Sequence, residues 1–226
     1  IWNQFLFADY ARALADDGWT HSHPIEVEVC HPTEIDEVFD AISYSKGASI
    51  IRMLVAFLGE DAFRKGLHLY LTRYQYGNAT TEDLWQALTE ASGQDVKAMM
   101  DCWTKQKGYP VVGVSGGQPG EKKSLAFTQS LFSRGKRETV SPKETQWIIP
   151  MSVESNVCSQ RDFTFPDKST YAFDFPPLSK ESWLKVNVKQ FGFYRVNYQP
   201  DFLQRLRPAI VSRALSSADR FGIQND

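Results

Sequence analysis

Three of the four histidines lie close together in the sequence, at His21, His23 and His31. On an extended segment His21 and His23 would face the same side, where two imidazoles could hold a metal ion. No Cys, Asp or Glu at a clear ligand spacing completes the set, and such histidines are more often solvent-facing or hydrogen-bonded to the backbone. The chain contains no HExxH, GxSxG, P-loop or GxGxxG motif. Its own motifs therefore predict no metal ligand and no complete active site.

Tyr44 stands where a phenol could do chemistry. It follows Ser43, a plausible N-cap, so it would lie in the first turn of a helix. The helix dipole and the free N–H groups there favour negative charge, and a tyrosine hydroxyl is a good donor to a developing oxyanion. The simpler interpretation is that Tyr44, one of nine tyrosines, only packs. The residues alone leave both interpretations open.

Helices are expected to build the first half of the chain. Periodic apolar residues and helix-end signals predict them over 2–14, 43–58, 60–74, 80–93 and 95–108. Thr80 and Asp83 resemble a capping box, Asp95 is a second N-cap, and Gly108 is the expected terminator of the last of these helices. Residues 25–29 alternate apolar and acidic side chains, which predicts a strand or an extended crossing.

The pattern changes after Tyr109 and Pro110. Short strand-like runs follow at 111–114, 125–132, 147–153, 171–175, 183–188 and 193–198. Their number and spacing predict a small antiparallel β-sandwich, with exposed loops over 116–124 and 133–144. Pro200 then restarts a helix, and Ser216 is the cap of another.

Composition sets limits on function. The 226 residues carry a formal net charge of −2, with 42% hydrophobic and 23% charged residues, as in ordinary globular proteins. Near-neutral charge argues against a dedicated nucleic-acid or membrane-surface role, and no apolar run approaches a membrane span. The three cysteines, Cys30, Cys102 and Cys158, form no CxxC pair, which favours buried, reduced thiols in a reducing compartment.

Five segments, in order, resemble one family. Residues 40–54 read DAISYSKGASIIRML, 79–85 read ATTEDLW and 103–110 read WTKQKGYP. Residues 192–198 read GFYRVNY and 219–226 read DRFGIQND. The chain therefore resembles, over almost its whole length, the zinc-dependent aminopeptidases with the HExxH gluzincin site, and among them the puromycin-sensitive aminopeptidases.

The resemblance implies an α+β multidomain fragment. Residues 1–109 are similar to the helical C-terminal part of a thermolysin-like catalytic domain. Residues 110–198 are similar to the β-sandwich that follows it, and residues 199–226 to the start of a C-terminal α-helical domain. The chain begins at Ile1 without Met and stops soon after a helix start. Both ends are therefore expected to be cuts inside structured elements of a longer polypeptide.

The resemblance also implies roles. Such enzymes remove N-terminal residues from peptides with a zinc-activated water and a glutamate general base. Tyr44 corresponds to the tyrosine that donates a hydrogen bond to the tetrahedral oxyanion. Phe39 corresponds to an aromatic lining the pocket for the substrate's first side chain, although a core aromatic is the simpler interpretation.

The family's zinc histidines, general base and third glutamate ligand would lie before Ile1. The fragment alone is therefore expected to bind no catalytic zinc and to be inactive. Its expected partners are peptide substrates in the parent enzyme and the missing N-terminal and zinc-binding portions of its own chain. The face of the helical block that should pack on the missing portion would be exposed, so self-association of the fragment is also expected. A cytoplasmic location is expected from the resemblance and the cysteines. The alternative is a non-catalytic helical and β-sandwich interaction module, or a degenerate homologue.

Overall fold

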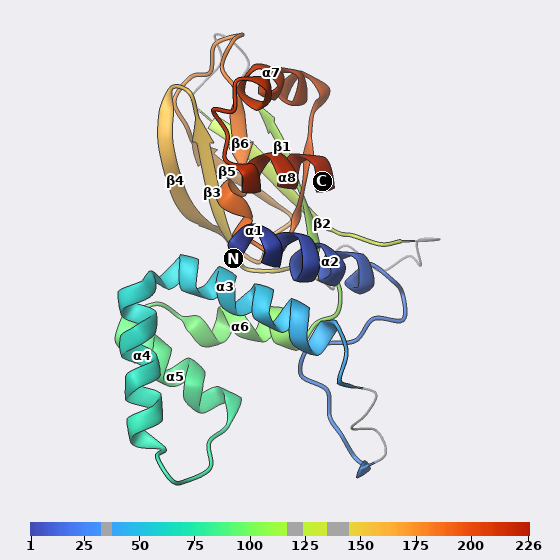
Figure 1. The fold of residues 1–226 in the computed structure, drawn as a ribbon. Coiled ribbons are helices and arrows are strands. Elements are labelled where there is room, and N and C mark those ends of the chain that lie inside the picture. The colour runs from blue at the N-terminus through green and yellow to red at the C-terminus, as the bar shows by residue number, and fades with distance from the viewer. Residues whose placement is uncertain (33–37, 117–123, 135–144) are drawn as a thin grey trace.

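The computed structural model describes residues 1–32, 38–116, 124–134 and 145–226. The chain is α+β, with a helical block on one side of two β-sheets (Figure 1). The first helix lies at the junction between block and sheets, and the last helix lies next to it. These two helices touch, since the Asn3 amide donates a hydrogen bond of 3.0 Å to the Ser217 hydroxyl.

The helical block confirms the predicted helices, with changes at their ends. The first is one continuous helix interrupted by a π-helical stretch, in the order α1 (Trp2–Phe5), η1 (Leu6–Tyr10) and α2 (Ala11–Asp17). The second also starts as a π-helical turn, and the full set is η3 (Ile42–Lys46), α3 (Gly47–Leu58), α4 (Glu60–Arg73), α5 (Thr81–Ser92) and α6 (Val96–Thr104).

One expectation within this block is corrected, and one open alternative is excluded. α6 ends at Thr104, before Gly108, although Gly108 does adopt the left-handed φ of 79° that favours glycine. For residues 25–29 a strand and an extended crossing were both open, and the segment forms no strand. The Glu26 N–H donates to the Thr104 carbonyl over 2.9 Å, so this crossing is tied to the end of α6.

The capping box of α5 is confirmed. The Thr80 hydroxyl accepts from the Asp83 N–H at 3.4 Å, and the Asp83 carboxylate accepts from the Thr80 N–H at 2.8 Å. The same carboxylate accepts from the Tyr74 hydroxyl at 2.9 Å, which joins the end of α4 to the start of α5. Gly93 ends the helix in the left-handed conformation.

We expect Thr80→Ala to lower the free energy of unfolding by about 1 kcal/mol, because an N-terminal N–H of α5 loses its acceptor. Thr81→Ala is the matched control, since Thr81 is exposed and lies inside the helix, where such a change usually costs less than about 0.5 kcal/mol. Urea unfolding of the two variants measures the difference. Equal losses in both would show that the cap contributes nothing.

The second half forms two sheets. A four-stranded sheet has the order β5-β2-β1-β7 and a three-stranded sheet the order β4-β3-β6. The strands are β1 (Pro110–Gly116), β2 (Ser124–Leu131), β3 (Ile149–Ser155), β4 (Cys158–Phe165), β5 (Thr170–Asp174), β6 (Leu184–Val186) and β7 (Arg195–Tyr198). A 3₁₀ turn, η4 (Val188–Gln190), follows β6. The expected exposed loops fall largely on 117–123 and 135–144, outside the described residues.

The sequence pattern predicted an antiparallel sandwich, and this is wrong for one pair of strands. β1 and β7 pair in parallel, with Val112 opposite Val196. β7 follows all three strands of the other sheet in the chain, so a local turn does not constrain its direction. β4 is absent from the predicted strands because it lies at a sheet edge, where its residues from 159 to 162 are exposed and polar.

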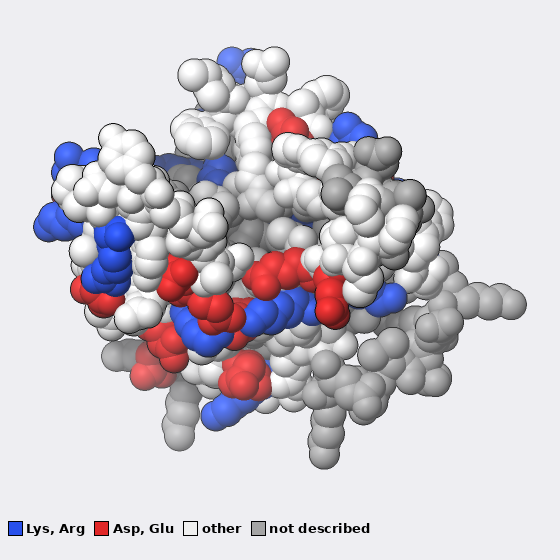
Figure 2. Space-filling view, turned by 90° about the horizontal axis from the view of Figure 1, so that it is seen from below, with Lys and Arg blue, Asp and Glu red and all other residues white. Residues whose placement is uncertain are grey.

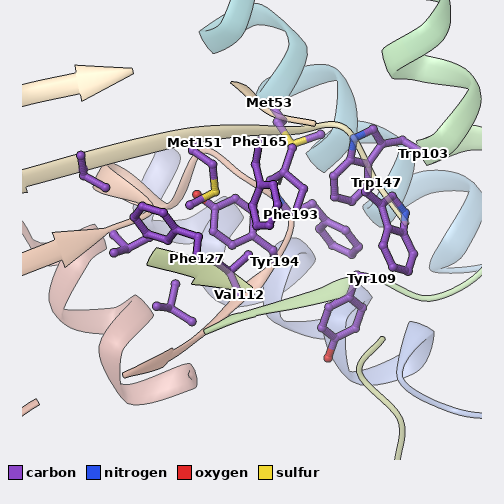
Figure 3. Packing of buried hydrophobic residues seen from close by; sticks show 14 of the residues in the cluster. Met53, Trp103, Tyr109, Val112, Phe127, Trp147, Met151, Phe165, Phe193 and Tyr194 are labelled. Carbon is purple, nitrogen blue, oxygen red and sulfur yellow. Dashed lines mark hydrogen bonds between the residues drawn. The ribbon is translucent and has the colours of Figure 1, made fainter. Parts of the chain in front are cut away.

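The core passes from the helical block into the sheets without a break. Trp103 of α6 lies beside Trp147 at 6.0 Å between ring centroids, and its indole N–H donates to the Ile148 carbonyl. In Figure 3 this tryptophan pair continues into a layer of buried residues around Phe165 and Phe193. The helical block that carries Tyr44 therefore packs on the close-packed core that it shares with the sheets.

The C-terminal residues form α7 (Pro200–Val211) and α8 (Ser217–Asn225). The predicted cap of α8 is confirmed, because the Ser216 hydroxyl accepts from the Asp219 N–H at 3.1 Å. A small separate cluster of Leu206, Ala209 and Leu215 packs α7 against Trp183 and Tyr198.

Surface charge of both signs is mixed where the helical block is viewed from below. Figure 2 shows acidic and basic side chains interleaved in a central band of this face. Between α5 and α6 the charges are paired: Lys97 contacts Glu82 and Asp101, and Lys105 contacts the same two carboxylates. In the described part of the chain, no helix has both the length and the apolar character needed to cross a bilayer.

Candidate active site

Tyr44 lies in η3, the π-helical turn that leads into α3. Its side chain is 61% exposed, and within the described ranges no residue forms a hydrogen bond with its hydroxyl. π-Helical turns are rare in proteins as a whole, but a large share of them occur at functional sites. They shift side chains out of the regular helical register. The hydroxyl is thus available as a donor to a molecule bound at this surface.

The backbone around Tyr44 explains why the turn forms. The Ala41 carbonyl accepts from both the Ser45 and the Lys46 N–H groups, each at 2.9 Å, and the second bond is the wider i+5 type. Ala41 and Ile42 are buried and anchor the turn from below.

The sequence predicted Ser43 as the cap of this turn, which is wrong: the N-cap position is Ala41, and the side chain that binds the first N–H groups is that of Asp40. One Asp40 oxygen accepts from the Ile42 N–H at 2.9 Å and from the Ser43 N–H at 3.0 Å. Burial acts to raise the pKa of Asp40, but the hydrogen bonds from Ser43, His23 and Ile42 outweigh it and lower that pKa below its usual value. Asp40 precedes the first free N–H groups, and this position was the signal that could have identified it.

Phe39 lies beside Tyr44. Its side chain is 62% exposed, and the two ring centroids are 6.0 Å apart with a 32° tilt. The structure therefore brings together the two residues that the sequence analysis singled out. Phe39 is not a core aromatic, which was the simpler interpretation of it.

A buried ion pair supports the turn from inside. The Lys46 ammonium lies 2.9 Å from the Asp17 carboxylate, and both side chains are 0% exposed. The ammonium also donates to the Gln106 and Gly108 carbonyls, and the carboxylate accepts from Ser22 and the Gly108 N–H. Burial lowers the pKa of Lys46, and the contact with Asp17 opposes this shift. Asp17 and Lys46 are far apart in the chain, so no local sequence pattern indicates that they pair.

The histidines do not form a metal centre. Among the described residues, no group of three or more His, Cys, Asp or Glu side chains is placed to hold a metal ion. His21 is exposed and stacks on Trp19. Both ring nitrogens of His23 already have partners, the Pro24 carbonyl at 2.6 Å and the Asp40 carboxylate at 2.8 Å. The described residues therefore do not fit a catalytic zinc ion.

The cysteines differ from their expected burial. No disulfide joins them, but Cys30 is exposed, whereas Cys102 and Cys158 are half-buried. Burial raises the pKa of the Cys102 thiol to about 12, so it stays protonated at neutral pH.

A cavity of 620 Å³ lies elsewhere, between α3 and the strands β3 and β4. Arg52 is one of its lining residues, and its guanidinium donates to the Gln190 and Lys189 carbonyls and faces the Phe191 ring. Neither Phe39 nor Tyr44 lines this cavity. The surface that carries Tyr44 is a separate feature.

Comparison with known proteins gives a consistent picture. Residues 1–103 match the peptidase family M1 domain. All of the chain aligns with a puromycin-sensitive aminopeptidase of Caenorhabditis elegans at 42% identity and with aminopeptidase M1 of Arabidopsis thaliana at 44% identity. For aminopeptidase 2, mitochondrial, of Saccharomyces cerevisiae the identity is 38%, again over the whole chain. The chain spans 24% and 26% of the length of the first two of these relatives.

Proposed function

Because this chain belongs to peptidase family M1, we propose that it is part of a metalloaminopeptidase that uses zinc to remove the N-terminal residue from peptides. The observation that carries this proposal is the match itself. It runs through the entire chain at 42% and 44% identity, and the relatives concerned are named as aminopeptidases.

Tyr44 is the proposed catalytic residue within this chain. Its exposed hydroxyl would donate a hydrogen bond to the oxyanion of the tetrahedral intermediate, where negative charge develops. Phe39, with its ring 6.0 Å from that of Tyr44, would contact the side chain of the substrate's first residue. The exposure of both rings on one surface supports these roles.

The zinc ion would be held by residues outside this chain, because the described residues gather no ligand set. Its chemistry in the parent enzyme is activation of the attacking water. The contribution of this chain is the donor at Tyr44 and the rigid base on which the donor stands.

The domain organisation is part of the proposal. Residues 1–109 would complete a thermolysin-like catalytic domain, 110–198 would be the β-sandwich beside it, and 199–226 would begin a C-terminal helical domain. The change from helices to strands at Pro110 and the restart of helix at Pro200 support these boundaries. A cytoplasmic location is proposed with them.

Exposed apolar side chains on the first helix suggest where another part of the parent protein would pack. Trp2 is 61% exposed, Phe7 is 74% exposed, and both belong to the first helix, next to the helix that carries Tyr44. Such residues usually mark a surface that another part of a protein covers. We propose that the zinc-binding portion of the parent covers them, and that the isolated chain would self-associate through them.

The test compares two proteins. We expect the full-length protein to cleave aminoacyl-p-nitroanilides, to lose this activity with 1,10-phenanthroline and to regain it with zinc. The isolated chain of 226 residues is expected to show neither cleavage nor bound zinc by elemental analysis, because its described residues hold no ligand set.

Silence of the full-length protein in the presence of zinc would contradict the enzymatic proposal and favour a non-catalytic interaction module. Cleavage by the isolated chain would show instead that the active site is complete within it. A panel of several aminoacyl substrates prevents a narrow side-chain preference from being mistaken for inactivity.

A further inference from the structure

His23 contacts the cap of the Tyr44 turn. Its Nε2 lies 2.8 Å from one Asp40 oxygen, while the other Asp40 oxygen accepts the N–H groups of Ile42 and Ser43. The Asp40 carbonyl accepts the next N–H, that of Tyr44, at 3.2 Å. A single residue therefore holds the first three N–H groups of the turn, and His23 fixes the orientation of its carboxylate.

Both ring nitrogens of His23 lie within hydrogen-bond distance of an oxygen that accepts hydrogen bonds. The Pro24 carbonyl, 2.6 Å from Nδ1, can only accept a hydrogen bond, and the ionised Asp40 carboxylate can only accept as well. The contact with Asp40 is a charge-assisted hydrogen bond, which is shorter and stronger than a neutral one.

The segment that carries His23 is itself fixed on both sides. The Ser22 hydroxyl donates to the buried Asp17 carboxylate at 2.6 Å, and the Glu26 N–H donates to the Thr104 carbonyl at 2.9 Å. Because Asp17 also pairs with Lys46, this segment and the Tyr44 turn share one anchor. His23 thus transmits the position of a rigid segment to an exposed turn.

We propose that His23, paired with Asp40, is a positioning residue that holds the Tyr44 hydroxyl where the oxyanion forms. The inference rests on the proposed function of Tyr44. The hydrogen bonds of the His23 ring go to Pro24 and Asp40, so we infer that it acts on Tyr44 through the orientation of the turn. A small displacement of a catalytic group is enough to slow a reaction strongly.

The experiment is a double-mutant cycle in the full-length enzyme, with His23→Gln and Tyr44→Phe alone and together. We expect His23→Gln to lower kcat about tenfold, less than the roughly 100-fold that a 1 Å misplacement can cost, and to change KM less than about twofold. In the Tyr44→Phe background the same substitution is expected to change kcat by less than about twofold, because the donor that it positions is already absent. His21→Gln is the matched control, since His21 is exposed and only stacks on Trp19.

A tenfold loss from His23→Gln in both backgrounds would overturn the proposal, because the role would then be structural and independent of Tyr44. An unchanged kcat for His23→Gln in the enzyme that retains Tyr44 would also overturn it. An unchanged kcat for Tyr44→Phe would instead refute the proposed function of Tyr44, and with it this inference. If His23→Gln does not fold, Asp40→Asn takes its place in the cycle, because it keeps the cap acceptor and removes only the charge that faces His23.

Discussion

In the full-length enzyme, Tyr44→Phe is expected to lower kcat by about 10²–10³, which is the usual cost of removing one donor from an oxyanion site. KM should change little, because the hydrogen bond is strongest in the transition state. The substitution removes only an exposed hydroxyl that no described residue binds, and it keeps the ring that lies beside Phe39. Steady-state kinetics on a peptide or p-nitroanilide substrate measures the effect.

Tyr74→Phe is the control for this experiment. It also removes one hydroxyl, which donates to Asp83 at the junction of α4 and α5 and not at the candidate site. We expect this variant to keep its kcat. Wild-type turnover in Tyr44→Phe would remove Tyr44 from the mechanism, and a large drop in its melting temperature would show that the hydroxyl stabilises the fold instead.

For stability, the largest expected effect is at the buried Lys46–Asp17 pair. Lys46→Met should lower the free energy of unfolding by about 3–5 kcal/mol, because it leaves the Asp17 carboxylate buried without its counter-ion. Adding Asp17→Asn should recover part of this loss, since the second change removes the unpaired charge. Urea unfolding of the two single variants and the double variant measures these terms.

The control is an ion pair of similar length on the surface. Arg64 and Asp61 lie 2.9 Å apart, and their side chains are 78% and 84% exposed. Asp61→Asn should therefore cost no more than about 1 kcal/mol. A loss at Lys46 as small as the loss at Asp61 would mean that the surrounding carbonyl and hydroxyl partners alone hold the Tyr44 turn.

Local signals accounted for most of the helices. Thr80 and Asp95 cap their helices through contacts three residues away, and the sequence alone contains both partners of each contact. The strand β4 and the parallel pairing of β7 could not be predicted in this way. The first depends on lying at a sheet edge, and the second on which distant strand it meets.

The same distinction between local and long-range contacts applies to the candidate site. Tyr44 and Phe39 were identified because their short segment resembles a known one, and the structure places them side by side. Of the residues packed behind them, His23 was considered only as a metal ligand, and Lys46 and Asp17 were not identified. Their contacts join segments that are distant in sequence, and only the folded chain brings these segments together.

The texture of the sequence changes sharply at Pro110, yet the hydrophobic cluster crosses that point without a gap, through Trp103, Tyr109 and Trp147. The change in composition at Pro110 therefore does not divide the chain into two parts that unfold independently. Opening the sheets would remove the base of the helices, and the two parts would unfold as a single thermodynamic unit. The position of Tyr44 thus depends in part on strands that follow it in the chain by more than a hundred residues, from β3 onward.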